Sequence, residues 1–208
     1  MLDVSAVVLF HRATCNAFFE SGVAPACPDR SPVWRAIAAN HENNMLLWAE
    51  EDLARRTHAP AEEIVANKRA IDAYNQARND AIEQIDDGLM LLLPPGAGIG
   101  RLSSETPGSM IDRLSIASLK FYHMSLQARR SDVWDEHREG CRRKAGRIAE
   151  QREDISDCLR ILLDDCMAGR ACFKTYRQFK MYNDPRLNMA LVREARNMSG
   201  ASLSTGLC

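Results

Sequence analysis

The sequence predicts an all-α protein, folded as a single-domain bundle of about six helices with an apolar fourth helix at its centre. Alternation of β-branched and polar residues with period two, the pattern of a strand, does not persist anywhere in the 208 residues. Helix-starting residues recur instead, and each is followed by a long segment of helical periodicity. Apolar residues make up 46% and charged residues 26%, so the chain holds enough apolar side chain for one sizeable core.

The first three helices are delimited by residues that form caps and loops. A helix over residues 3–20 is followed by the stretch 21–30, whose proline and glycine residues predict a loop. Ser31 precedes a proline, the pattern of an N-cap followed by proline at the first helical position, and a second helix should run over 32–56. The third helix, which also begins with a proline, is expected over 60–92 and has two glutamates in its first turn.

The glycine- and proline-rich stretch 94–100 should separate this helix from the fourth, expected over 106–130. The fourth helix carries apolar residues nearly all round, namely Met110, Ile111, Leu114, Ile116, Leu119, Phe121, Tyr122, Met124 and Leu126. We therefore expect it at the centre of the bundle. Ser131 and Asp132 are expected to cap a long fifth helix that ends near Gly169.

The remaining elements are shorter. A sixth helix is expected over 171–181, where aromatic and basic residues interleave, and a further short helix over 187–196. No internal repeat divides the chain. We expect one domain over residues 1–197 and a flexible tail over 198–208.

Composition argues against several classes of protein. The 27 basic and 28 acidic residues give a net charge of -1, without the basic surplus typical of nucleic-acid binding. The densest apolar run, 89–93, is far shorter than the roughly 20 residues of a membrane-spanning helix. The N-terminal stretch lacks the pattern of a signal peptide, so a cytoplasmic location is expected. The seven cysteines, without a C-x-x-C pair, are expected to be reduced thiols.

The helix expected over 60–92 has an unusual polar face. An Asn or Asp inside a helix costs about 0.6 kcal/mol relative to Ala, so solvated faces favour other polar residues. This face carries Asp72, Asn75, Asn79, Asp80 and Asp86. Such a set favours an inward-facing polar site, with an ordinary solvated face as the alternative.

Two other helices carry polar residues on partly apolar faces. In the second helix, one sector holds His41, Asn44, Trp48, Glu51, Asp52 and Arg55. The simpler interpretation of Arg55 is an ion pair with Glu51 one turn away. In the fourth helix, Asp112 and His123 share a narrow polar stripe, where the alternative for His123 is a hydrogen-bonded core histidine.

One metal pattern is present. The H-E-x-x-H and E-x-x-H patterns are absent, which argues against zinc-peptidase and di-iron chemistry. Glu83 and Asp86 form an E-x-x-D on one helix face, and Glu51 with Asp52 could approach from another helix. Oxygen ligands of this kind suit Mg²⁺.

Several phrases resemble a known family. They are HENN (41–44), LWAEED (47–52), NQARNDAIE (75–83), ETPGSMIDRLSI (105–116), YHM (122–124) and RQFKMYNDP (177–185). Together they resemble the family catalogued as domain of unknown function 4254. The resemblance implies a bacterial helical protein associated with cell-envelope polysaccharide genes. A more distant similarity links the chain to all-α nucleoside triphosphate pyrophosphohydrolases, although the third carboxylate of their E-E-x-x-E motif is missing here.

The leading hypothesis is a Mg²⁺-dependent hydrolase or transferase that acts on a phosphorylated small molecule, such as a nucleotide or nucleotide-sugar. The expected catalytic residues are His41, Asp112 and His123. The expected metal ligands are Glu51, Asp52, Glu83 and Asp86. The expected substrate contacts are Asn44, Arg55, Lys68, Asn75, Arg78, Asn79, Glu105, Arg113, Lys120 and Lys180.

Two alternatives stay open. One is a non-catalytic adaptor or partner of envelope-polysaccharide glycosyltransferases, in which the polar stripes form a buried ion-pair network. The other is a protein that binds an anionic metabolite without turnover. A homodimer is compatible with each of these.

Overall fold

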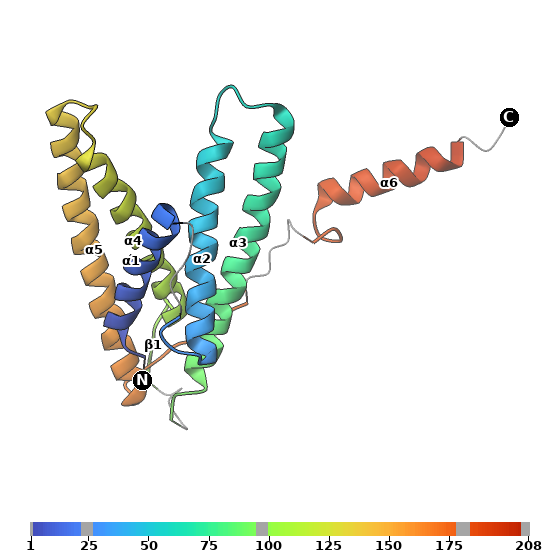
Figure 1. Ribbon diagram of the computed structural model, residues 1–208. Coiled ribbons are helices and arrows are strands. Elements are labelled where there is room, and N and C mark those ends of the chain that lie inside the picture. Colours follow the sequence, from blue (N-terminus) through green and yellow to red (C-terminus); the bar gives the residue numbers. More distant parts are fainter. Residues whose placement is uncertain (1, 22–26, 95–99, 178–183, 205–208) are drawn as a thin grey trace. The chain divides into compact units, whose positions relative to one another are not determined.

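The computed structural model describes residues 2–21, 27–94, 100–177 and 184–204 (Figure 1). The chain divides into two compact units, Met1–Thr175 and Tyr176–Cys208. The first unit contains α1 (Val4–Ser21), α2 (Pro32–Ala54), α3 (Ala61–Met90), β1 (Arg101–Leu102), α4 (Pro107–Arg129), α5 (Asp135–Met167) and β2 (Ala171–Cys172). The second contains α6 (Met189–Ser204). The predicted all-α bundle is confirmed. No helix in the described ranges is long and apolar enough to span a membrane.

Local capping chemistry explains where two of the helices begin. The Ser31 hydroxyl accepts a hydrogen bond from the Trp34 backbone amide, and proline follows it at the first helical position. Thr106 and Ser109 form a reciprocal capping box at the start of α4. Each cap satisfies backbone amides that have no partner inside the helix. Both predicted starts are therefore confirmed.

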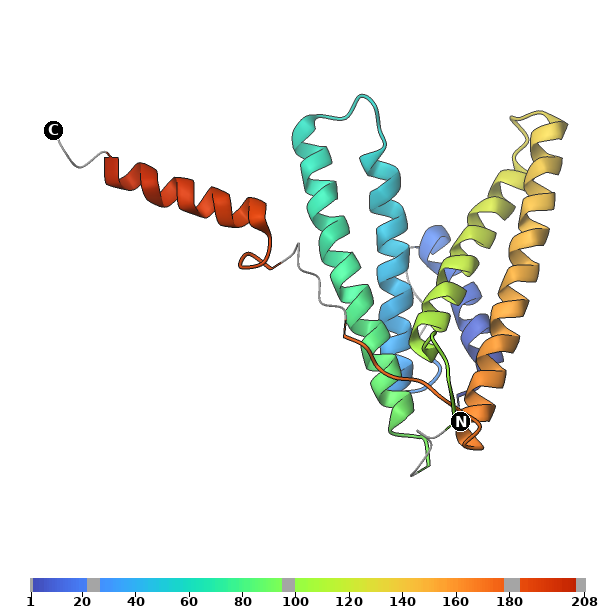
Figure 2. The same cartoon turned by 180° about the vertical axis from the view of Figure 1, so that it is seen from behind.

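Helix α4 lies at the centre of the bundle, as predicted, and contacts α1, α2, α3 and α5. In both views, α2 with α3 and α4 with α5 form two hairpins, which approach each other near β1 and diverge toward their connecting loops (Figure 2). The larger core cluster includes Val7, Ile37, Ile85, Leu89, Ile111, Leu114, Leu159 and Leu163. A second, smaller cluster contains Cys15, Met45, Leu119 and Tyr122.

The helix predicted over 171–181 is wrong in the part that the structure describes. Residues 171–172 form β2, which pairs in parallel with β1, and 173–177 have no regular structure. The Arg101 amide donates to the Arg170 carbonyl and the Ser103 amide to the Cys172 carbonyl. Gly169, with a φ of 71°, turns the chain out of α5. This pairing gives the backbone partners that a helix would otherwise supply. Residues 178–181 lie outside the described ranges.

Two other boundaries differ from expectation. Helix α5 begins at Asp135 with Trp134 at the N-cap, not at Ser131. The Asp132 carboxylate binds the guanidinium of Arg130 and is therefore occupied away from the helix start. Helix α6 extends to Ser204, beyond the segment 187–196 expected to be helical. The flexible tail expected over 198–208 stays a prediction.

Gly108 marks the closest approach of α4 to α3. A Cβ atom there would lie 2.5 Å from the Ile82 carbonyl oxygen and 2.8 Å from Asp86 Oδ1. We expect Gly108→Ala to lower the free energy of unfolding by about 2–3 kcal/mol, because the backbone of α3 cannot yield without repacking. Chemical denaturation measures this change.

Gly146→Ala is the matched control on α5, because no atom lies within 4 Å of its Cβ position. This variant should raise the free energy of unfolding by about 0.5–1 kcal/mol through helix propensity alone. Similar effects of the two substitutions would contradict a close contact at Gly108.

Candidate functional site

A buried polar network joins α2 to α4. Asp112 Oδ1 accepts hydrogen bonds from Asn40 Nδ2 at 2.9 Å and from Asn44 Nδ2 at 2.8 Å. Arg78 Nε of α3 lies 3.8 Å from the same oxygen. Asn44 Nδ2 also donates to Ser115 Oγ at 3.0 Å. The carboxylate is buried, so these donors provide the stabilisation that water would otherwise give it.

The network continues to two histidines. His41 Nδ1 lies 2.7 Å from Ser115 Oγ, and its Nε2 lies 3.0 Å from the His11 carbonyl oxygen. The two imidazole rings stack with centroids 4.3 Å apart. Burial lowers the pKa of His41 to about 4 and lowers that of His11 as well. Both rings are therefore neutral at neutral pH. His41, expected to be catalytic, has its hydrogen-bonding groups engaged inside the bundle.

A pocket of about 350 Å³ lies beside this network. Its lining residues are Asn44, Leu47, Trp48, Glu51, Asp52, Arg55, Asn75, Arg78, Ile116 and Leu119. The structure thus brings together six of the residues selected from the sequence, which come from α2 and α3. Arg55 Nη1 pairs with Glu51 Oε2 at 2.6 Å, so the ion pair that the sequence predicts for Arg55 is present.

The four carboxylates expected to hold Mg²⁺ are not brought together. The Cβ position of Gly88 lies 2.7 Å from Val33, so the end of α3 that carries Glu83 and Asp86 packs against the beginning of α2. Glu51 follows Val33 by 18 residues, which corresponds to roughly 27 Å along a helix. In the described part of the chain, no group of three or more His, Cys, Asp or Glu side chains is placed to hold a metal ion.

Asp86 has a structural partner instead. Its Oδ1 accepts a hydrogen bond of 2.6 Å from the Gly108 amide, where α4 begins. Burial raises the pKa of Asp86 to about 6, although its hydrogen bonds to Thr106 and Gly108 act in the opposite direction. The carboxylate serves to attach the start of α4 to α3.

The other selected residues are dispersed. Lys68 pairs with Asp72 on the exposed face of α3, and Arg113 pairs with Glu105. The His123 ring stacks on Trp48 with centroids 4.4 Å apart, and burial lowers its pKa. Asn79 is buried and Lys120 is exposed, and neither lines a pocket described here. Lys180 lies outside the described residues.

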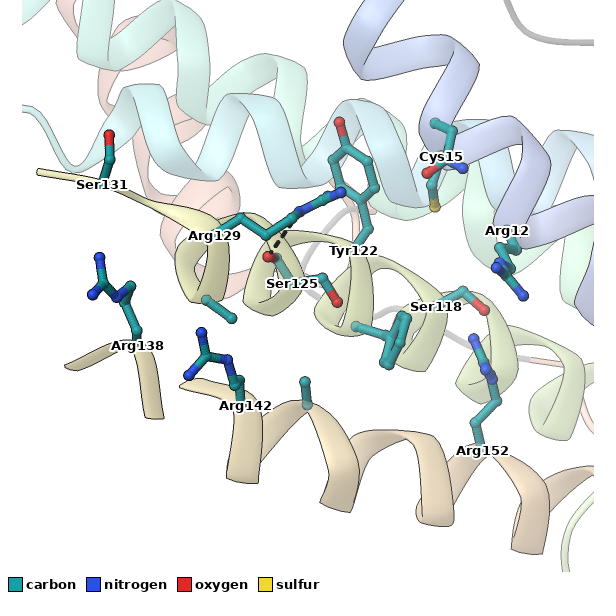
Figure 3. Close-up of a pocket in the computed structure, with 14 residues that line it drawn as sticks. Arg12, Cys15, Ser118, Tyr122, Ser125, Arg129, Ser131, Arg138, Arg142 and Arg152 are labelled. Atoms are coloured by element: carbon teal, nitrogen blue, oxygen red, sulfur yellow. Dashed lines mark hydrogen bonds between the residues drawn. The ribbon is translucent and has the colours of Figure 1, made fainter. Parts of the chain in front are cut away.

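A pocket lined by several arginines was not expected from the sequence. A pocket of about 670 Å³ lies between α1, α4 and α5 (Figure 3). Its lining residues are Arg12, Cys15, Asn16, Ser118, Phe121, Tyr122, Ser125, Ala128, Arg129, Ser131, Arg138, Arg142, Ala145 and Arg152. We call this the arginine pocket. It has five arginines in its lining, and no carboxylate among the described lining residues.

Two arginines at one end of the arginine pocket have no carboxylate partner among the described residues. Arg12 of α1 and Arg152 of α5 approach each other beside Ser118, and neither forms an ion pair within the described ranges (Figure 3). Arg152 Nη1 and Ser118 Oγ are buried without a hydrogen-bond partner. Burial, and then the charge of Arg12, lowers the pKa of Arg152. Its guanidinium lies 5.0 Å from the centre of the Phe121 ring.

The arginines at the other end are engaged with their own helices. Arg142 Nη1 lies 3.1 Å from Glu139 Oε2, and Arg138 binds Asp135. Arg129 Nε donates to the Ser125 carbonyl oxygen. The Arg142–Glu139 pair is exposed and the Arg138 side chain is 29% exposed, and surface pairs of this kind contribute little to stability. Their guanidinium groups can therefore exchange partners at small cost.

The lining favours binding over proton transfer. It contains no histidine, and burial raises the pKa of the Cys15 thiol to about 12 and raises that of Tyr122. A general base that works near neutral pH needs a pKa near that value. The described lining of the arginine pocket therefore supplies cations and hydroxyl groups but no base.

One sequence signal for this pocket was present. Arg138, Arg142, Ala145 and Arg152 follow each other at i, i+4, i+7 and i+14, so they share one face of α5. Ala145 and Cys141 on this part of the helix are buried, which shows that the face is turned inward. Charged residues on a helix more often form an ordinary solvated surface, so this signal is weak by itself. The meeting of this face with Arg12, 140 residues away from Arg152, could not be derived from local periodicity.

The fold and the pocket define a helical-bundle protein with a basic pocket between three helices. The model of the family described as "Protein of unknown function (DUF4254)" matches residues 34–175, and the chain belongs to this family. The predicted resemblance is confirmed. Neither the curated proteins nor the solved structures contain a match to this chain.

The buried position of Asp86 predicts a pH-dependent stability. Because its pKa rises from 3.8 to about 6 on folding, the native state binds more protons than the unfolded state between these values, and stability falls as pH rises through them. The amide of an asparagine at this position does not ionise. The free energy of unfolding of Asp86→Asn, relative to that of the wild type, should therefore rise by up to about 3 kcal/mol between about pH 4 and pH 7.

Denaturant titrations at both pH values measure this difference. Asp80→Asn, which alters an exposed carboxylate of the same helix, controls for the substitution itself. If the stability of Asp86→Asn relative to the wild type instead falls as pH rises, burial does not raise the pKa of Asp86.

Proposed function

We propose that this protein binds a phosphorylated small molecule in the arginine pocket and holds it without turnover. The observation that carries the proposal is the pair Arg12 and Arg152, which face one pocket without a carboxylate partner in the described chain. Burial makes the charge of Arg152 costly, and the nearby charge of the exposed Arg12 repels it. An anionic ligand would remove both penalties, and this supports an anion as the natural occupant.

Arginine chemistry favours phosphate among anions. The planar guanidinium presents several N–H donors in a fixed arrangement, which matches two oxygens of one phosphate group. Ser118 Oγ, buried and without a partner, supplies a hydroxyl donor at the same place. The volume of about 670 Å³ is in the range of pockets for small metabolites.

Binding without turnover is preferred because of the groups that the pocket lacks. The described lining has no carboxylate to hold Mg²⁺ and no side chain with a pKa suited to proton transfer near neutral pH. Arginines alone bind phosphate but do not activate a nucleophile. The function proposed here is therefore that of a sensor, carrier or regulatory subunit for a phosphorylated metabolite.

The proposal predicts a loss of affinity in Arg152→Gln. Calorimetric titration with inorganic phosphate, pyrophosphate and a panel of nucleotides and nucleotide-sugars should find ligands that bind the wild type. In Arg152→Gln, their Kd should rise about 10- to 100-fold, the equivalent of losing about 1.5–3 kcal/mol of charged hydrogen bonds.

Arg147→Gln is the matched control, because it removes the same charge from an exposed position of α5 outside the pocket. It should change the Kd less than twofold at moderate salt. Equal losses in both variants would indicate a non-specific charge effect, and the absence of binding to the wild type would refute the proposal.

A further inference from the structure

We infer that the ligand of the arginine pocket is an elongated molecule with an anionic group at each end, one of them a phosphate. This inference rests on the proposed function and adds the shape and charge distribution of the ligand. It is drawn from the spacing of the five arginines along the pocket. These form two groups with an uncharged section between them.

The inner group is Arg12 with Arg152, and the outer group is Arg129, Arg138 and Arg142 (Figure 3). Arg142 and Arg152 are ten residues apart on α5, which corresponds to about 15 Å along the helix axis. A single phosphate bound between Arg12 and Arg152 would therefore not reach the outer group. A second anionic group of the same ligand would contact the outer group by exchange with the exposed carboxylates of Asp135 and Glu139.

The section between the two groups carries no charge. Its side chains come from α4 and α5 and are Tyr122, Ser125, Ala128 and Ala145. The two alanines are buried and small, so they leave room between the helices. Hydroxyl groups and an aromatic ring suit a neutral, partly apolar linker with hydrogen-bonding groups, such as a sugar or a nucleoside.

The two ends differ in how their cations are held. The inner arginines have no carboxylate partner in the described chain. In the outer group, Arg138 and Arg142 pair with Asp135 and Glu139, and Arg129 donates to the Ser125 carbonyl oxygen. The inner end should therefore contribute most of the affinity for a phosphate. The outer end should contribute only when the ligand is long enough to reach it, because the second contact is then intramolecular.

The ligand class that meets these conditions is a phosphorylated metabolite whose far end carries a second phosphate or a carboxylate. A compact anion such as inorganic phosphate can contact only the inner arginines. The difference between one-ended and two-ended anions can be measured without knowing the natural ligand.

The test compares two synthetic probes of equal chain length, an α,ω-octanediyl bisphosphate and octyl monophosphate, by calorimetric titration. The wild type should bind the bisphosphate at least about tenfold more tightly than the monophosphate. Arg152→Gln should weaken both probes about tenfold or more. Arg142→Gln should weaken the bisphosphate about fivefold or more and leave the monophosphate unchanged.

Arg143→Gln is the control for the outer end. Arg143 is an exposed neighbour that lies near the same Glu139 carboxylate at 3.8 Å, but it does not line the pocket. This variant should bind both probes as the wild type does. A loss equal to that of Arg142→Gln would show that only general surface charge attracts the second phosphate, and would overturn the inference.

The outcomes also separate the two proposals. If the wild type binds both probes equally and Arg152→Gln weakens both, the ligand has one anionic end, so this inference fails and the proposed function stands. If neither probe nor inorganic phosphate binds the wild type, both proposals fail together.

Discussion

The buried carboxylate of Asp112 lies where α2, α3 and α4 meet, and its hydrogen bonds determine how the central helix is rotated. A carboxylate removed from water is tolerated only when donors surround it. Asn40 and Asn44 provide those donors from one neighbouring helix, and Arg78 approaches from another. A different rotation of α4 would leave both the carboxylate and the amides unpaired.

This constraint also sets the neighbouring face of α4, because Ser115, Ser118, Tyr122 and Ser125 follow one another at i, i+3, i+7 and i+10. With Asp112 and Ser115 directed toward α2, the side chains of Ser118, Tyr122 and Ser125 line the space beside α1 and α5. Arg12 and Arg152 reach that space from two different helices. The arginine pocket therefore adjoins the polar network, and Cys15 Sγ in its lining lies 3.5 Å from His41 Nε2.

The two polar clusters differ in what they leave unsatisfied. In the network around Asp112, the Asn40 and Asn44 amides, the Ser115 hydroxyl and the His41 imidazole bind one another, whereas both ring nitrogens of His11 and Arg78 Nε are buried without a hydrogen-bond partner. The hydrogen-bonded part of this network stabilises one packing arrangement. In the arginine pocket, Arg152 Nη1 and Ser118 Oγ are buried without partners. Buried donors without partners beside a pocket indicate a ligand site better than the number of polar residues does.

The sequence by itself determined the helical class, the starts of α2 and α4 and the central place of α4, because capping and periodicity are local properties. It also identified the costly Asn and Asp residues, of which Asn75 lines the smaller pocket and Asp86 attaches α4 to α3. Only the tertiary structure decided the pairing of β1 with β2, the separation of Glu51 from Asp86, and the meeting of Arg12 with Arg152. Each of these depends on segments far apart in the chain, and no local pattern encodes which distant side chain will lie opposite.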